Sequence, residues 1–207
     1  MHIGLPKAPF LYPILDTEFS EYPLIDARKI IKAGAEILQL RAKNLSKRAI
    51  YALAVELAPL CNENQVCFLL NDWVDIALVT ETSGIHLGQE DFPVDQARPL
   101  LEGKILGLST HNSEQFEVAN RLPIDYIALG PVYETKTKRS SNRALGIPGI
   151  TPLIKGKFKP VVAIGGIRQE YFPELLAAGV DGIALISELY RQGDLYDTVS
   201  RLLESLE

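Results

Sequence analysis

Short apolar runs alternate with longer amphipathic segments along the chain, and this alternation predicts its fold. The short runs are continuously apolar, which is typical of parallel strands buried on both faces. They predict strands over residues 10–15, 36–41, 66–70, 84–87, 105–109, 125–130, 160–166 and 182–187. The amphipathic segments predict helices over residues 22–35, 46–64, 72–80, 93–101, 113–122, 148–156, 168–179 and 194–206, with Ser46 as an N-cap and Gly179 at a helix end.

Eight strand–helix units predict an α/β fold, a single-domain (β/α)8 TIM barrel that occupies residues 1–207. The alternative is a doubly wound open sheet, but no glycine-rich dinucleotide turn follows the first strand. No Pro/Gly/Ser-rich linker divides the chain either. Active sites of such barrels lie at the carboxyl ends of the strands, so the polar residues after each strand are the candidates for chemistry.

The composition narrows the class of protein. The chain is 47% hydrophobic with a net charge of −5, which predicts neither nucleic acid nor a membrane as a partner. No run approaches the roughly 18 apolar residues of a membrane span. Cys61 and Cys67 have no companion Cys or His nearby and are predicted to be ordinary part-buried thiols in a reducing compartment. We therefore expect a cytoplasmic protein. The composition leaves its oligomeric state open, a homo-oligomer included.

Charged residues follow the second, third and fourth predicted strands. Arg41 and Lys43 share one side of an extended segment with Gln39, an arrangement that suits a phosphate and a polar ring but equally a solvated strand exit. Asp72 by itself fits a helix cap better than a metal ligand. Together with Asp91 on the next unit, however, it predicts a shared Mg²⁺ site, because Mg²⁺ commonly binds one or two carboxylates and substrate phosphates.

The later strand ends add donors for anions. Ser109 ends the fifth strand, and Gly165, Gly166 and Ser187 follow the seventh and eighth, where this fold usually binds phosphate. Two histidines accompany these residues. His86 is predicted to be a packed, hydrogen-bonded barrel residue. His111 is a candidate acid or base, although Asn112 or Ser113 beside it also fits a helix cap.

The sixth strand leads into a basic, hydroxyl-rich segment, LGPVYETKTKRSS, at residues 129–141. In a chain of negative net charge, such a segment indicates a local anion site. Lys138 with Arg41, Lys43, Ser109 and Mg²⁺ would hold a highly charged group such as a diphosphate. A separate phosphate would lie at Gly165, Gly166 and Ser187. Two anionic substrates in one site indicate a transferase that joins them.

Seven stretches in order, QLRAK, LLNDWVDIAL, GIHLGQED, GLSTHN, DYIALGPVYETKTK, VVAIGGI and GVDGIALIS, resemble the motifs of the thiamine phosphate synthase family over residues 36–187. The resemblance implies a (β/α)8 barrel. It also implies that hydroxymethylpyrimidine diphosphate and thiazole phosphate are joined to give thiamine phosphate and pyrophosphate. In that reaction pyrophosphate leaves first, and the thiazole nitrogen captures the pyrimidine cation that remains.

The resemblance also implies a role for each matching position. It implies that Arg41, Lys43, Ser109 and Lys138 are catalytic and that Asp72 and Asp91 bind the cofactor Mg²⁺. It implies substrate contacts from Gln39, Leu40, Arg41, Ala42, Lys43, Asn71, Ser109, Thr135, Lys136, Thr137, Lys138, Gly166, Ile186 and Ser187. Two positions depart from the family pattern: Ala42 stands where Glu is usual, and Glu134 where Pro is frequent.

Three other functions stay open at this point. One is a thiazole tautomerase paralogue with the same barrel, although the intact Asn-Asp and Gln-Glu-Asp motifs at residues 71–72 and 89–91 favour the synthase. Another is a Schiff-base aldolase that uses Lys43 or Lys138, which requires an unprotonated lysine. The third is a non-catalytic protein that binds thiamine phosphate.

Overall fold

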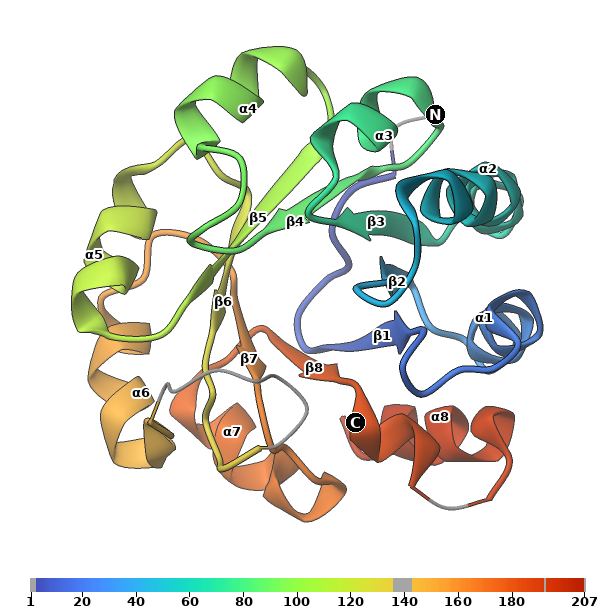
Figure 1. The fold of residues 1–207 in the computed structure, drawn as a ribbon. Helices are drawn as coiled ribbons and strands as arrows, with labels where there is room; N and C mark the ends of the chain where they lie inside the picture. Colours follow the sequence, from blue (N-terminus) through green and yellow to red (C-terminus); the bar gives the residue numbers. More distant parts are fainter. Residues whose placement is uncertain (1–2, 136–142, 192, 207) are drawn as a thin grey trace.

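The structure is a computed structural model that describes residues 3–135, 143–191 and 193–206. Within these ranges eight parallel strands form a closed barrel in sequence order, with the last strand paired to the first (Figure 1). The strands are β1 (Phe10–Asp16), β2 (Ile37–Arg41), β3 (Cys67–Asn71), β4 (Gly84–Leu87), β5 (Ile105–Thr110), β6 (Tyr126–Leu129), β7 (Val161–Ile164) and β8 (Gly182–Leu185). The predicted TIM barrel is confirmed.

The helices of the described ranges surround the barrel (Figure 1). They are α1 (Pro23–Lys32), α2 (Lys47–Glu63), α3 (Val74–Val79), α4 (Val94–Leu100), α5 (Ser113–Arg121), α6 (Gly146–Lys155), α7 (Phe172–Ala178) and α8 (Leu195–Glu204), with 3₁₀ turns η1 (Gln169–Tyr171) and η2 (Ser187–Tyr190). None of the described helices is long and apolar enough to span a membrane. The Ser46 hydroxyl caps α2 by accepting the Ala49 N–H at 3.3 Å, as predicted.

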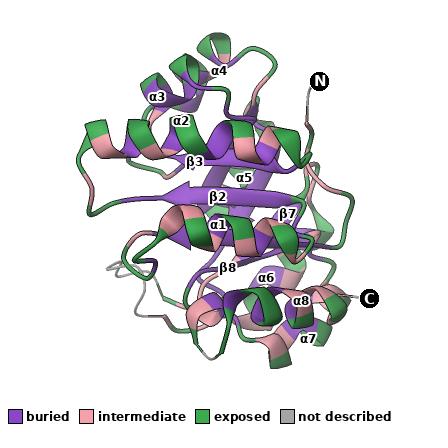
Figure 2. Cartoon of the chain, turned by 90° about the vertical axis from the view of Figure 1, so that its right-hand side faces the viewer, coloured by how far each residue is buried: buried purple, intermediate pink, exposed green. Residues whose placement is uncertain are grey.

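Alternate residues of each strand enter two different cores. In β1, Leu11 and Leu15 pack outward against the helices, whereas Tyr12 and Ile14 point into the barrel. The strands are therefore buried on both faces, and the helices bury one face each (Figure 2). This arrangement explains why the strands are continuously apolar in the sequence while the helices are amphipathic.

Two predicted elements differ from the observed ones, a strand that is shorter and a helix that is divided, and both differences have backbone causes. The predicted strand 160–166 stops at Ile164, because Gly165 and Gly166 adopt φ of +98° and +66°, outside the extended region. The predicted helix 168–179 is divided into η1 and α7, because Pro173 lacks an N–H to continue the helix and instead occupies its first turn. Gly179 ends α7 at φ +91°, as predicted.

Both cysteines are free and fully buried, so they are more enclosed than the part-buried thiols that the sequence predicted. Burial raises the pKa of each thiol to about 12. Because the thiolate is the reactive form, we expect neither cysteine to react with Ellman's reagent at pH 8 in the folded protein. After unfolding in guanidinium chloride, both thiols of each chain should react with the reagent. Rapid reaction of the native protein would contradict this expectation.

Candidate active site

Most of the predicted site residues that the structure describes gather at the carboxyl end of the barrel, around three cavities with shared walls. A charged cavity is lined by residues at or just after the ends of β2 to β5, and a phosphate-type cavity by residues at or just after the ends of β5 to β8. A narrow cavity lies deeper in the barrel. Arg41, Asn71 and His86 line both it and the charged cavity, while Ile164 and Ala184 line both it and the phosphate-type cavity.

Two carboxylates and a lysine form the centre of the charged cavity. Lys43 Nζ lies 2.5 Å from Asp72 Oδ2. Burial raises the pKa of Asp72, and the adjacent Asp91 carboxyl raises it further, while Lys43 opposes the shift. Asp72 adopts φ +70° and the N-terminus of α3 has no side-chain cap, so the capping interpretation of Asp72 is wrong. The strained backbone turns this carboxylate towards Lys43 and Asp91.

Hydrogen bonds hold the loop after β4 against β5. Asp91 Oδ2 accepts the Gly88 N–H at 2.6 Å, and Gln89 Nε2 donates to the Ser109 carbonyl at 2.6 Å. The Ser109 side chain, only 4% exposed, lines the same cavity. The loop therefore holds Asp91 opposite Asp72 and beside a hydroxyl donor.

The donor set fits a hard divalent cation completed by a ligand. Among the described residues, no group of three or more His, Cys, Asp or Glu side chains could hold a metal by itself. Asp72 and Asp91 nevertheless form a pair, and the Asp91 carboxyl adds to the effect of burial in raising the pKa of Asp72. Mg²⁺ typically binds one or two carboxylates together with substrate phosphates. The pair fits Mg²⁺ that arrives with a phosphorylated substrate.

Arg41 is held by a buried ion pair that the sequence did not reveal. Its Nη1 donates to Asp16 Oδ2, and the two residues are 7% and 0% exposed. The other oxygen of Asp16 accepts the Glu18 N–H at 3.0 Å. With its charge balanced from β1, Arg41 can present its remaining donors to the charged cavity.

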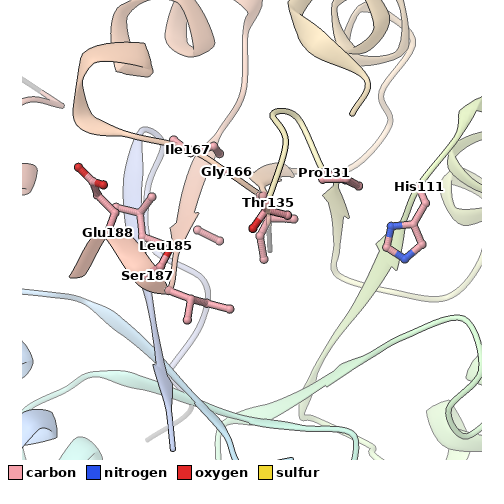
Figure 3. A pocket seen from close by; sticks show the side chains of 12 residues that line it. His111, Pro131, Thr135, Gly166, Ile167, Leu185, Ser187 and Glu188 are labelled. Carbon is pink, nitrogen blue, oxygen red and sulfur yellow. The ribbon is translucent and has the colours of Figure 1, made fainter. Parts of the chain in front are cut away.

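The phosphate-type cavity is shown in Figure 3. Its walls include Gly165, Gly166, Ser187, Thr135 and His111. The positive φ of the two glycines and the start of η2 at Ser187 bring backbone to this cavity in a form suited to an anion. Beyond it, Tyr133 stacks on Tyr171 with the ring centroids 4.2 Å apart.

His111 lies at the edge of this cavity on the β5 side (Figure 3). Its Nδ1 lies 2.6 Å from the Gly130 carbonyl, an acceptor, so Nδ1 carries the proton. Its backbone N–H donates to Gln115 Oε1 at 2.8 Å. Asn112 caps α5 by accepting the Gln115 N–H at 2.9 Å, one of the two caps that the sequence predicted.

Most of the predicted site residues lie on these walls. Those that line a cavity are Gln39, Arg41, Lys43, Asn71, Asp72, Asp91, Ser109, Thr135, Gly166, Ile186 and Ser187. Leu40 and Ala42 instead pack in the outer core, because strand alternation turns their side chains towards the helices. Lys136, Thr137 and Lys138 lie outside the described residues.

Sequence reasoning missed three inward-facing residues: Asp16, Tyr12 and Tyr126. Asp16 ends β1, but the predicted strand stopped at residue 15 and its carboxylate was not considered. A charged residue at the end of an apolar run was the available signal. The two tyrosines appeared to be ordinary apolar strand residues, and only barrel closure brings their hydroxyls to 2.9 Å from each other.

Comparisons with known proteins agree with this geometry. Residues 11–189 match the family model for thiamine monophosphate synthase. The chain is 37% identical to a thiamine-phosphate synthase from Persephonella marina, covering 95% of each chain, and 36% identical to one from Chlorobium phaeobacteroides, covering 98% of each.

A solved thiamine phosphate pyrophosphorylase from Pyrococcus furiosus superposes with a TM-score of 0.88 at 31% identity, with 95% of each chain covered. More distant barrels share the fold alone, among them the tryptophan synthase α-subunit from the same organism, with a TM-score of 0.70 at 14% identity. The resemblance seen in the sequence is confirmed: the chain belongs to the thiamine monophosphate synthase family, transferases of thiamine biosynthesis.

Proposed function

We propose that this chain joins hydroxymethylpyrimidine diphosphate to thiazole phosphate in a Mg²⁺-dependent reaction that releases pyrophosphate. One observation carries the proposal. A cavity with paired carboxylates, two cationic side chains and a serine hydroxyl is connected through the narrow cavity to a separate cavity with glycine-rich backbone suited to a phosphate. Two compartments of different chemistry at one barrel end suit two anionic substrates that react with each other.

The charged cavity supports departure of the diphosphate. The bond between the pyrimidine methylene carbon and the diphosphate oxygen breaks, and its electron pair leaves with the diphosphate. Arg41, Lys43 and Ser109 line the cavity where that negative charge develops. Preorganised donors aimed at developing charge supply much of the barrier reduction in reactions of this kind. No protein nucleophile is required.

Asp72 and Asp91 would hold Mg²⁺ against the diphosphate. The cation, when bound, supplies positive charge that stabilises the leaving group. The two carboxylates would bind the cation and orient it towards the diphosphate. Their own positions are fixed, because Asp91 accepts the Gly88 N–H and Asp72 is paired with Lys43. Burial and the nearby Asp91 carboxyl both raise the pKa of Asp72. A bound cation would offset the repulsion between the two carboxylates.

The narrow cavity supports the position of the pyrimidine ring. It lies between the charged cavity and the phosphate-type cavity and is lined by Gln39, Asn71 and apolar side chains such as Ile164. The cavity itself holds only about 10 Å³, so the ring would lie at its open end, with the diphosphate on the side of the charged cavity and the thiazole on the side of the phosphate-type cavity. The thiazole nitrogen then gives its lone pair to the methylene carbon and forms the new C–N bond. The apolar walls limit capture of the cation by water.

The alternatives receive less support from the geometry. Lys43 is ion-paired with Asp72 and its side chain is 46% exposed, whereas a Schiff-base lysine is typically desolvated in an apolar pocket. Lys138, the other candidate, lies outside the described residues. A tautomerase has no need of paired carboxylates beside a cation cluster.

The proposal is tested by one assay. Purified protein is supplied with both substrates and Mg²⁺, and thiamine phosphate and pyrophosphate are measured together. We expect equal amounts of the two products and loss of both on addition of EDTA. Folded protein that forms neither product would refute the synthase assignment. Product formed equally well with excess EDTA would refute the metal requirement.

A further inference from the structure

A continuous chain of five polar side chains crosses the interior of the barrel. Gln39 Nε2 donates to Tyr12 Oη at 2.7 Å, and Tyr12 Oη lies 2.9 Å from Tyr126 Oη. Tyr126 Oη lies 2.8 Å from His86 Nδ1, and His86 Nε2 lies 2.8 Å from Ser109 Oγ. None of the five residues is more than 5% exposed. The chain joins Gln39 on the β2 side of the site to Ser109 on the β5 side through three residues, Tyr12, Tyr126 and His86, to which the proposed function gives no role.

The space for this chain depends on Gly107. A Cβ at this position would lie 2.1 Å from Tyr126 Cζ and 2.5 Å from its hydroxyl oxygen. Tyr126 is the β6 neighbour of Gly107, and His86 is its β4 neighbour. A residue without a side chain on β5 therefore allows a phenol from β6 to reach a histidine from β4. The ring of Tyr126 also stacks on His86 with the centroids 5.6 Å apart.

The order of donors and acceptors gives the chain a direction. Burial raises the pKa of Tyr12 and Tyr126, so both hydroxyls keep their hydrogens. Tyr12 already accepts from Gln39, so its own hydrogen is available to Tyr126. Tyr126 then donates to His86 Nδ1, which places the imidazole hydrogen on Nε2. In that tautomer His86 donates to Ser109 Oγ.

We propose that this chain of hydrogen bonds positions the two substrate-facing groups at its ends, Gln39 and Ser109. Tyr12, Tyr126 and His86 act as positioning residues. Because Ser109 Oγ accepts from His86, its own hydrogen is free to donate to a diphosphate oxygen in the charged cavity. Because the Gln39 amide nitrogen is held by Tyr12, the amide oxygen is left as an acceptor for the pyrimidine amino group. These end roles rest on the proposed function, whereas the direction of the chain does not.

The histidine tautomers test the direction without any turnover. The protein contains three histidines, so the imidazole nitrogens of protein labelled with ¹⁵N-histidine can be assigned by NMR. We expect His86 to carry its hydrogen on Nε2 and His111, which donates from Nδ1 to Gly130, to show the opposite tautomer. Tyr126→Phe should shift His86 towards a mixture while His111 stays unchanged. A wild-type His86 with its hydrogen on Nδ1 would overturn the proposal.

A double-mutant cycle tests whether the chain acts through Ser109. Tyr126→Phe removes one oxygen and should lower kcat about 10- to 100-fold, with the KM for thiazole phosphate unchanged. In a Ser109→Ala background the same substitution should have almost no further effect, since its target hydroxyl is gone. Effects that multiply would show a merely structural role and overturn the proposal.

Two further variants complete the kinetic test. Tyr12→Phe breaks the chain one link earlier and should reproduce the kcat loss, which keeps the test informative if Tyr126→Phe folds poorly. Tyr51→Phe removes a phenol oxygen from the exposed face of α2 and should leave kcat unchanged. Absence of turnover in wild-type protein would refute the proposed function, and the tautomer measurement would then still decide the direction of the chain.

Discussion

Asp91→Asn is expected to lower kcat/KM for thiamine phosphate formation by about 100-fold or more, because the reaction loses one of the two carboxylates proposed to hold Mg²⁺. The asparagine oxygen can still accept the Gly88 N–H that Asp91 accepts at 2.6 Å, so the loop after β4 should keep its conformation. Burial raises the pKa of Asp72 and the Asp91 carboxyl raises it further, so the substitution removes the second of these causes. Steady-state rates measured over a range of Mg²⁺ concentrations check the expectation.

The matched control is Asp75→Asn. Asp75 lies on α3, three residues from Asp72, and pairs with Lys47 at 2.5 Å on the surface, with 59% of its side chain exposed. The Asp75→Asn variant loses the same charge as Asp91→Asn, but at a residue that does not line the cavity. Activity and Mg²⁺ dependence should therefore stay at wild-type levels. If Asp91→Asn retained activity within about tenfold, roughly 1.4 kcal/mol in the barrier, the metal assignment would be wrong.

Gly166→Ala should raise the KM for thiazole phosphate by about tenfold or more, with a smaller effect on the pyrimidine substrate. A Cβ at Gly166 would lie 2.5 Å from the Glu134 carbonyl oxygen and 2.8 Å from that of Tyr133. Backbone cannot give way as a flexible side chain can, so the segment that carries Thr135 has to move. Thr135 lines the same cavity as Gly166, and the displacement should distort the phosphate site. Kinetics with each substrate varied in turn measure the difference.

Gly34→Ala separates this clash from simple backbone strain. Gly34 also has positive φ, +102°, but a Cβ there would meet only the Leu203 side chain at an ordinary 3.7 Å. It follows α1, at the barrel end opposite the site. Gly34→Ala should therefore lower the melting temperature without changing either KM. An equal rise in the thiazole phosphate KM in both variants would show that strain, not the blocked cavity, is responsible.

The sequence by itself determined the fold and the end of the barrel where the site lies. The strand at Gly84–Leu87 was predicted with its observed bounds, and the Ser46, Asn112 and Gly179 signals were each found at helix ends. These features depend on residues close together in the sequence: continuous apolar runs, amphipathic periods and local capping. Site residues that directly follow strands were predictable for the same reason, since closing a parallel barrel places all carboxyl ends on one face.

Only the tertiary structure decided how those residues are paired. Asp16 and Arg41 are separated by 25 residues, and Tyr12 and Tyr126 by 114, so no local pattern relates them. The role of Asp72 depended on a positive φ and on Lys43 from another unit, neither of which a capping pattern contains. For a hydroxyl or carboxylate inside the barrel, the hydrogen-bond partner and the role as donor or acceptor are set by side chains on other strands. Those strands come together only when the barrel closes. The charge balance of Arg41 and the orientation of Ser109 are therefore properties of the closed barrel.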